Sequence, residues 1–284
     1  MEPLPRGEIE RAIKPALAED IGTGDATTLA TVPDSARARA VMAAREPLVV
    51  AGLDLAVAAF RELSKDVRCE YLLGDGQRAA EAQPLLRVEG PARAILSAER
   101  VALNFLQRLS GIASLTAQFV EAVAGTQAQI LDTRKTTPGW RILEKYAVRC
   151  GGGHNHRIGL FDMVLIKDNH LAALAQEKPN AIAAAVSRAR KAYPQLKIEV
   201  EADSLEQVQQ AADAGADMIL LDNMTPAELR ASVEIVRGRA KTEASGGVSL
   251  ASVRIIAESG VDFISVGALT HSARAMDIGL DFEA

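Results

Sequence analysis

The sequence is poor in the features that mark secreted, membrane-spanning and nucleic-acid-binding proteins. Its 284 residues include only two cysteines, Cys69 and Cys150, which are too few for the disulfide framework of a secreted domain. No apolar run approaches the ~20 residues that span a bilayer, and the first residues lack the basic and then apolar pattern of a signal peptide. A net charge of −5 argues against general nucleic-acid binding. The expectation is therefore a cytoplasmic globular protein.

The chain does contain ample apolar sequence and one local excess of positive charge. Apolar residues make up 48% and charged residues 24%, which suits a packed core in one large domain or two ordinary ones. Between Thr133 and Lys167, seven Lys and Arg oppose two acids. A positive window in an acidic chain suggests a dedicated anion pocket. For Arg141, Lys145 and Arg149, spaced four residues apart, a solvated basic helix face is the plainer interpretation.

From about residue 128 onward, short apolar runs alternate with amphipathic stretches. The segment 225–230, TPAELR, has the Thr, Pro and Glu of a capping box, and Ser204 and Ser249 are further candidate helix caps. Several of the runs are short, apolar and branched, as buried parallel strands tend to be. Repeated βα units predict a parallel sheet. The strand candidates are 128–132, 163–167, 196–202, 218–222, 241–245 and 262–267.

Nearly every one of these strands ends in polar or glycine residues. In a (β/α) barrel, the carboxyl ends of all strands converge on one mouth, where the chemistry takes place. An open doubly wound sheet would use mainly the loops at its switch point. We therefore expect an α/β chain whose second part is a barrel.

The first hundred residues predict a smaller α+β module. Segments 36–52, 67–77 and 84–97 are expected as strands separated by turn residues, and 52–64 as a helix. Ser97 is the expected cap of a long amphipathic helix, 97–123, that joins the two parts of the chain.

Two glycine-containing segments near the end of the chain suggest a phosphate site. EASGGVS (243–249) and SVGALTHS (265–272) each follow a strand candidate and precede a helix candidate. Glycines let backbone N–H groups approach an anion, and barrel phosphate sites often use the loops after the last two strands. The alternative is that these glycines only shape turns.

The positive window begins at one strand end and finishes at the next. Arg134 and Lys135 follow the strand candidate 128–132, Lys167 ends the next one, and GGGHNHR (151–157) lies between them. Two unit charges about 4 Å apart interact by roughly 4 kcal/mol at an effective dielectric of about 20, so this cluster needs a ligand or acidic neighbours. Guanidinium groups match carboxylates in a bidentate fashion. A polyanionic ligand follows, and the histidine spacing offers no recognised zinc site.

Three acids, Glu199, Glu201 and Asp222, come from neighbouring strand ends. Carboxylates without clustered His or Cys suit Mg²⁺, which keeps several waters and binds substrate phosphates. Glu199 and Glu201 share strand parity, so either could dominate. A different chemistry is open to Lys167, which could form a Schiff base as in barrel aldolases; trapping with borohydride would test it.

Eight long motifs are spread nearly from end to end of the chain. They are EDIGTGDATT (19–28), SAERVALNFLQRLSGIA (97–113), LDTRKTTPGWR (131–141), GGGHNHRIGLFDMVLIKDNH (151–170), IEVEADSLEQ (198–207), ILLDNM (219–224), EASGG (243–247) and DFISVGALTHS (262–272). Together they resemble the quinolinate phosphoribosyltransferases, the decarboxylating nicotinate-nucleotide pyrophosphorylases. The resemblance implies a small α/β sandwich domain at 1–110, with the C-terminal tail as a candidate addition, and an incomplete (β/α) barrel at 111–284, joined in a homodimer.

The resemblance also implies an activity in NAD biosynthesis. Quinolinate and phosphoribosyl pyrophosphate would give nicotinate mononucleotide, pyrophosphate and CO₂, with Mg²⁺ as cofactor. A paralogue that acts on another aromatic acid is the nearest rival. A non-catalytic, phosphosugar-binding regulatory barrel is harder to reconcile with so many charged strand ends.

Motif by motif, the resemblance implies roles for individual residues. The quinolinate carboxylates would be bound by Arg134, His156, Arg157 and Lys167, with Lys135 between them and the pyrophosphate. Glu201 and Asp222 would hold Mg²⁺, partly through water, and the ribose hydroxyls. The 5-phosphate would lie against Ser245, Gly246, Gly247, Gly267 and His271, and Thr133 and Ala268 complete the substrate-binding set. Lys135, Lys167, Glu201 and Asp222 are the expected catalytic residues. Arg100 would reach into the partner subunit's site.

Overall fold

A computed structural model describes residues 2–283 and divides the chain into two compact units. The first unit contains the residues up to Ala117 together with Thr136–Gly152 and the segment from Leu269 onward. The second unit contains Gln118–Lys135 and Gly153–Ala268. The chain therefore passes from the first unit to the second twice, and its last segment belongs to the first unit.

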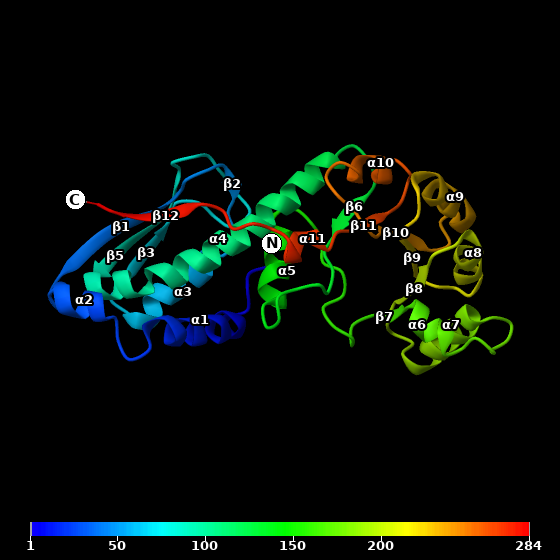
Figure 1. The fold of residues 1–284 in the computed structure, drawn as a ribbon, viewed down its shortest axis with the longest axis horizontal. Helices are drawn as coiled ribbons and strands as arrows, with labels where there is room; N and C mark the ends of the chain where they lie inside the picture. The colour runs from blue at the N-terminus through cyan, green and yellow to red at the C-terminus, as the bar shows by residue number, and fades with distance from the viewer. Residues whose placement is uncertain (1, 284) are drawn as a thin grey trace. The chain divides into compact units, whose positions relative to one another are not determined.

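The first unit is built on a four-stranded antiparallel sheet in the order β12-β1-β5-β3. Its outer strand β12 is the end of the chain and pairs with β1, so that Ala40 lies opposite Phe282; Figure 1 shows the two side by side. A two-stranded ribbon of β2 and β4 completes the strands of this unit. The bounds are β1 Arg37–Ala44, β2 Leu48–Val49, β3 Arg68–Tyr71, β4 Arg78–Ala79, β5 Pro84–Pro91 and β12 Ile278–Phe282.

The long helix α4 begins earlier than its sequence pattern predicts. It starts at Ala92, directly after β5, and not at Ser97. Ser97 lies inside the helix, where its Oγ donates to Asp25 Oδ2 at 2.8 Å, and Asp25 is itself the cap of α2. The helix starts early because the segment 92–96 contributes apolar side chains to the core, among them the fully buried Ile95. The helices are α1 Arg6–Ile21, α2 Ala26–Thr31, α3 Leu53–Leu63, α4 Ala92–Ala122, α5 Arg141–Cys150 and α11 Ala268–His271.

Helix α5 is not the solvated basic face that the spacing of its cations predicts. Lys145 is 1% exposed, and the neighbouring Glu144 is completely buried. Glu144 accepts hydrogen bonds from Thr137, through the amide at 3.0 Å and the hydroxyl at 2.8 Å, and pairs with Arg108 at 3.3 Å. Buried polar groups need such partners, so this helix is packed on several sides.

The second unit contains six parallel strands in the order β6-β11-β10-β9-β8-β7. The first strand of the unit therefore pairs with its last, with Ile130 opposite Ile264. Within the described residues, no ladder joins β6 to β7. This is the strand order of a (β/α) barrel left open between its first two strands, which confirms the incomplete barrel. The bounds are β6 Gln129–Leu131, β7 Val164–Ile166, β8 Ile198–Ala202, β9 Met218–Asp222, β10 Lys241–Ser245 and β11 Phe263–Ser265.

Two of the three helix signals between these strands are confirmed, and one is wrong. Thr225 and Glu228 form the predicted capping box, and Ser204 caps α8. Ser249 does not begin a helix: its carbonyl accepts the Ser252 N–H at 3.1 Å in a turn, and α10 begins only at Val253. The helices are α6 Asp168–Ala172, α7 Ala181–Ala192, α8 Leu205–Asp213, α9 Pro226–Val236 and α10 Val253–Ala257. Across residues 2–283, no helix combines the length and the apolarity that a bilayer crossing requires.

Candidate active site

A cavity of about 560 Å³ lies at the carboxyl ends of the strands of the second unit. Most of the predicted site residues line it, although they come from loops spread over more than a hundred positions. The predicted residues among its walls are Thr133, Arg134, Lys135, His156, Arg157, Lys167, Glu201, Asp222, Ser245, Gly246 and Gly247.

The cations of the positive window converge in this cavity. Arg134 and Lys135 follow β6, Lys167 follows β7, and Arg157 lies in the connection between these strands. Burial and then the charge of Arg134 lower the pKa of Arg157, while the charge of Glu199 acts in the opposite direction. The positive charges of Arg134 and Arg157 are thus held close together, and the negative charge of Glu199 offsets part of their repulsion. A site for a polyanion requires such a cluster of cations.

A buried acid, Asp132, holds the histidine-containing loop in place. Asp132 follows β6 and is completely buried. Its Oδ1 accepts the His156 N–H at 2.8 Å, and its Oδ2 accepts the Asn155 side-chain amide at 2.7 Å. The loop that begins with three glycines at 151–153 is therefore held at Asn155 and His156 by hydrogen bonds to Asp132.

The His156 ring contacts two buried acids, Glu199 and Glu243, of which Glu243 also belongs to the cavity wall. Its Nε2 is 3.0 Å from Glu199 Oε2 and 3.3 Å from Glu243 Oε2. Its Nδ1 accepts the Arg157 backbone N–H at 2.8 Å. Both ring nitrogens are thus bonded within the protein, so a substrate carboxylate that bound the ring would have to displace one of these contacts.

The pKa values of His156 and Glu199 are linked. Burial lowers the pKa of His156, but its contacts with the two carboxylates outweigh this and raise the pKa to about 10. Burial and the charge of Glu243 raise the pKa of Glu199 to about 7. Because Nδ1 accepts an N–H bond, the ring proton that faces the two carboxyl groups lies on Nε2.

The same three side chains are close enough together to be considered as a metal site. A metal ion would need the Nε2 lone pair, and the Nδ1 of a ligating histidine normally donates its proton to a second partner. Here Nδ1 accepts a hydrogen bond. The ring proton therefore occupies the position that a metal would need, and the geometry favours a proton-linked cluster over a metal centre.

Of the two acids on β8, only Glu201 reaches the cavity wall. The Glu201 side chain is 16% exposed and its Oε2 lies 2.7 Å from Lys167 Nζ, whereas Glu199 is completely buried. Asp222, at the end of β9, also lines the cavity and accepts from its neighbour Asn223 at 2.8 Å. Two carboxylates at adjacent strand ends fit Mg²⁺, which takes its remaining ligands from water and substrate phosphates.

A glycine loop after β10 forms another part of the wall. Gly246 has a φ of +97°, and a Cβ added there would lie 2.1 Å from Asn223 Oδ1. Gly247 has a φ of +59° and open space around the position of a Cβ. Only glycine fits at position 246, because the Asn223 side chain leaves no room for a Cβ and because the positive φ is unfavourable for other residues. Because α10 begins only at Val253, no helix N-terminus directly follows this loop.

The remaining predicted residues do not line the cavity in the part of the chain that the structure describes. Gly267 and Ala268 follow β11 in the second unit. Arg100 and His271 belong to the first unit. The Arg100 side chain is exposed on α4, and His271 Nδ1 is hydrogen-bonded to the Ser272 hydroxyl at 2.6 Å.

The sequence analysis missed three polar residues of the cavity wall, Asn223, Glu243 and Ser265. Glu243 could have been found, because it shares strand parity with Ser245 on β10 and must face the same side of the sheet. Asn223 carried a weaker signal, since it follows the strand-end Asp222 and has the positive φ of +55° that asparagine tolerates.

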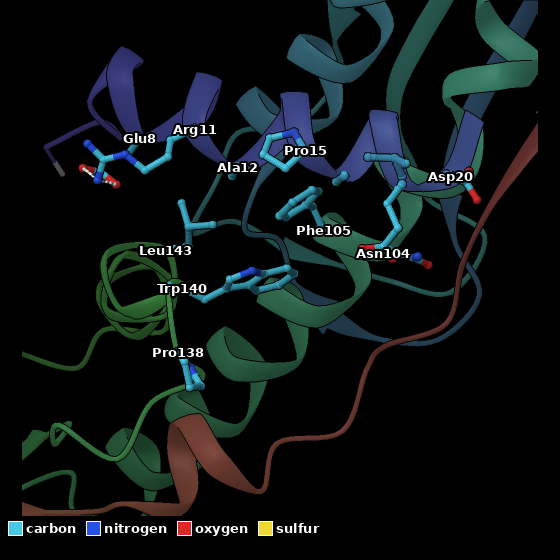
Figure 2. Close-up of a pocket in the computed structure, with 14 residues that line it drawn as sticks. Glu8, Arg11, Ala12, Pro15, Asp20, Asn104, Phe105, Pro138, Trp140 and Leu143 are labelled. Atoms are coloured by element: carbon cyan, nitrogen blue, oxygen red, sulfur yellow. Dashed lines mark hydrogen bonds and ion pairs between the residues drawn. The ribbon is translucent and has the colours of Figure 1, made fainter. Parts of the chain in front are cut away.

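A second cavity, of about 450 Å³, lies within the first unit and has a different character. Figure 2 shows Trp140 and Phe105 on one side of it, and their rings are stacked with centroids 4.8 Å apart. Arg11, which lines the cavity from α1, pairs with Glu8 at 3.0 Å. Asp20 adds another negative charge, so this cavity lacks the cation cluster that a polyanion would need.

Known proteins resemble this chain over nearly its whole length. The family model described as quinolinate phosphoribosyl transferase, N-terminal domain, matches residues 25–110, and the one for the C-terminal domain matches residues 112–281. A "Nicotinate-nucleotide pyrophosphorylase [carboxylating]" from Mycobacterium leprae is 47% identical over 275 residues, 95% of each chain. A "Probable nicotinate-nucleotide pyrophosphorylase [carboxylating]" from Bacillus subtilis is 41% identical, covering 96% of this chain and 93% of the relative. The solved nicotinate-nucleotide pyrophosphorylase from Francisella tularensis is 40% identical with a TM-score of 0.93, covering 99% of this chain and 98% of that one.

Proposed function

Because this chain belongs to the quinolinate phosphoribosyltransferase family, we propose that its second-unit cavity carries out the reaction of that family. The chain is a pentosyltransferase that transfers phosphoribosyl from phosphoribosyl pyrophosphate to quinolinate. The products are nicotinate mononucleotide, pyrophosphate and CO₂, a step of NAD biosynthesis. The observation that carries the proposal is the meeting of four cations, two accessible carboxylates and a glycine loop in one cavity.

Quinolinate is a dianion, and the cationic wall matches it. Arg134, Arg157 and Lys167 are proposed to bind its two carboxylates, with His156 beside them. Guanidinium groups bind carboxylates through paired hydrogen bonds. Lys167, which pairs with Glu201 at 2.7 Å, would leave this carboxylate and bind a carboxylate of the substrate.

Phosphoribosyl pyrophosphate would occupy the other half of the cavity. Its 5-phosphate is proposed to lie against Ser245, Gly246 and Gly247, where the absence of Cβ atoms allows close approach. Gly267, Ala268 and His271 are proposed to complete this cradle, and Thr133 to contact the substrates beside Lys135. Lys135, between the two substrates, would bind pyrophosphate oxygens.

Glu201 and Asp222 are the residues proposed to hold Mg²⁺. When bound, the ion neutralises the developing charge of the leaving pyrophosphate. The two carboxylates also face the ribose, whose C1 becomes cationic as the pyrophosphate leaves. Fixed negative charge at that position stabilises the transition state more than the ground state. This contribution comes from the chain itself.

The second half of the reaction needs less from the protein. The quinolinate nitrogen attacks the ribose C1 and becomes positively charged. The bond from the ring to the adjacent carboxylate then breaks and CO₂ departs; the neighbouring positive nitrogen stabilises the electron pair left on the ring carbon until that carbon takes a proton from solvent. The cations of the wall keep the ring oriented during both steps, so their part in decarboxylation is positional.

The functional form is proposed to be a homodimer. Arg100, on the exposed face of α4, is proposed to reach the partner subunit's substrates. A site built in this way needs two chains.

The test is an assay of CO₂ release and nucleotide formation with quinolinate, using nicotinate as the control substrate. We expect turnover with quinolinate and little with nicotinate, which lacks the second carboxylate. Equal turnover of nicotinate would overturn the specificity for a diacid. The Schiff-base alternative is tested by borohydride in the presence of substrate, which should leave Lys167 unmodified.

A further inference from the structure

Two buried acidic side chains beside the cationic wall have no role in the proposed chemistry. Glu199 comes from β8 and Glu243, which also lines the cavity, from β10, and their side chains are 0% and 1% exposed. Neither carboxyl oxygen of Glu243 has a hydrogen-bond partner among the described residues, and His156 Nε2 lies 3.3 Å from its Oε2. A pair of buried acids with so few partners is costly to the fold, so its presence calls for a compensating role.

The contacts above these acids form a short chain that ends in the substrate wall. The Nε2 of His156 is hydrogen-bonded to Glu199 at 3.0 Å and lies 3.3 Å from Glu243 Oε2 in an ion pair. On the other edge of the ring, Nδ1 accepts the backbone N–H of Arg157. The Arg157 guanidinium in turn donates to the Met163 carbonyl at 3.3 Å and lines the cavity. Each link depends on the orientation of the one before it.

We infer that Glu199 and Glu243 are positioning residues, whose buried carboxyl groups hold the His156 ring so that its Nδ1 fixes the Arg157 backbone and thereby aims the guanidinium at a substrate carboxylate. The inference rests on the proposed binding of quinolinate in this cavity. Glu243 is the more informative of the two, because it is remote in sequence from the carboxylates proposed to bind Mg²⁺.

Glu199 also lessens the repulsion between the cations of the wall. Arg134 disfavours the charge on Arg157, and the nearby charges of Glu199 and Asp162 favour it. Glu199 is completely buried and does not line the cavity, so it does this without occupying the space that the substrate needs.

The test uses Glu243→Gln, which keeps the shape of the side chain and removes its charge. The matched control is Glu206→Gln, the same change at an exposed position of α8. We expect the Kd and the KM for quinolinate to rise by at least about tenfold, because small misplacements of a binding group cost one to two orders of magnitude. The KM for phosphoribosyl pyrophosphate and the kcat at saturating quinolinate should change by less than about twofold. Glu199→Gln should show the same selective loss.

A purely structural role would give a different pattern. If Glu243→Gln weakened both substrates equally, or neither, the inference would be overturned while the proposed function stood. If the wild-type protein itself neither bound quinolinate nor released CO₂, the proposed function would fail instead. The two failures are therefore distinguishable.

A measurement on the wild-type protein covers the case in which the variants do not fold. With only four histidines in the chain, ¹⁵N-labelled histidine and NMR can identify the tautomer of each ring. We expect His156 to carry its proton on Nε2, with an unprotonated Nδ1. A protonated Nδ1 would break the link to Arg157 and overturn the inference whatever the variants did.

Discussion

The ammonium of Lys167 lies 2.7 Å from the carboxylate of Glu201 and joins the ends of two adjacent strands, β7 and β8. One member of this pair is proposed to bind quinolinate and the other Mg²⁺. Each group is thus the other's partner, and the proposed binding of quinolinate and Mg²⁺ would separate them. The pair keeps two charges of the cavity wall compensated until both ligands arrive.

Replacing Lys167 by alanine should remove a charged contact to quinolinate and leave Glu201 without its partner. Hydrogen bonds to charged groups contribute about 1.5–3 kcal/mol, so we expect kcat/KM for quinolinate to fall by about 10- to 150-fold. Steady-state kinetics with varied quinolinate measures this. The matched control is Lys241→Ala, which breaks the Lys241–Asp262 pair of 2.6 Å at the opposite end of the sheet. A similar loss in the control would show that any strand-end ion pair matters equally.

Introducing a methyl group at Gly246 should disturb the glycine loop. A Cβ there would lie 2.1 Å from Asn223 Oδ1 and 3.1 Å from the Asn223 backbone nitrogen. Overpacking of this kind costs about 1–3 kcal/mol, and the loop must also shift away from the position proposed for the 5-phosphate. We expect Gly246→Ala to lower the Tm and to raise the KM for phosphoribosyl pyrophosphate by about tenfold or more.

Gly247→Ala is the control for this prediction, because nothing lies within 4 Å of its Cβ position. Its φ of +59° still makes alanine unfavourable by roughly 1–2 kcal/mol. The control should therefore share part of the fall in Tm but show a smaller change in KM. If the two variants had the same KM, the contact with Asn223 would not shape the phosphate position.

The pH dependence of stability should contain a contribution from Glu46. Hydrogen bonds from Arg274 and from the Asp277 N–H lower the pKa of Glu46 to about 2 from its ordinary 4.5. A lowered folded-state pKa gives stability that is complete above pH ~4.5 and is lost as the pH falls toward about 2. Arg274 is 67% exposed, so solvent screening keeps the contribution below about 1 kcal/mol.

Urea unfolding of wild type and Glu46→Gln tests this prediction. The variant should be less stable at pH 7, and the difference in the free energy of unfolding should shrink as the pH falls below 4.5. Glu62→Gln, the same change at an exposed position of α3, is the control. A difference that stayed constant with pH would mean that the charge of Glu46 is not what stabilises the protein.

The sequence predicted the barrel strands well because most of them are short apolar runs that end in polar or glycine residues; β10, KTEAS, is the exception in composition. The polar residues after β6 to β10 identified one edge of the sheet, and proximity in the fold then followed from the strand order. This is why Arg134, Lys167 and Asp222, which are far apart in the chain, could be assigned to one cavity from their positions at strand ends alone.

What the sequence could not predict were features that depend on contacts between distant segments. Ser97 has the residue type of a helix cap, but the apolar residues before it extend α4 back to Ala92. Lys145 lies on an apparently basic face that packing buries. Glu199 and Glu201 lie on the same face of β8 and differ in how far along the strand they are. The alternation of side chains along a strand predicts the face but not this difference. Only Glu199, the more deeply buried of the two, contacts His156, whereas Glu201 contacts Lys167.

The proposed sharing of sites between subunits can be tested by mixing two inactive variants. Arg100→Ala keeps its own Lys167, and Lys167→Ala keeps its own Arg100. After unfolding and refolding together, half of the dimers would be hybrids, each with one complete site of two, so activity should recover to about a quarter of the wild-type value. CO₂ release from quinolinate measures the recovery. Mixing Arg134→Ala with Lys167→Ala is the control, because both residues line the same cavity and no hybrid site would contain both. Absence of recovery in the test pair would show that Arg100 acts within its own chain, and equal recovery in the control would show that recovery does not depend on Arg100 crossing to the partner.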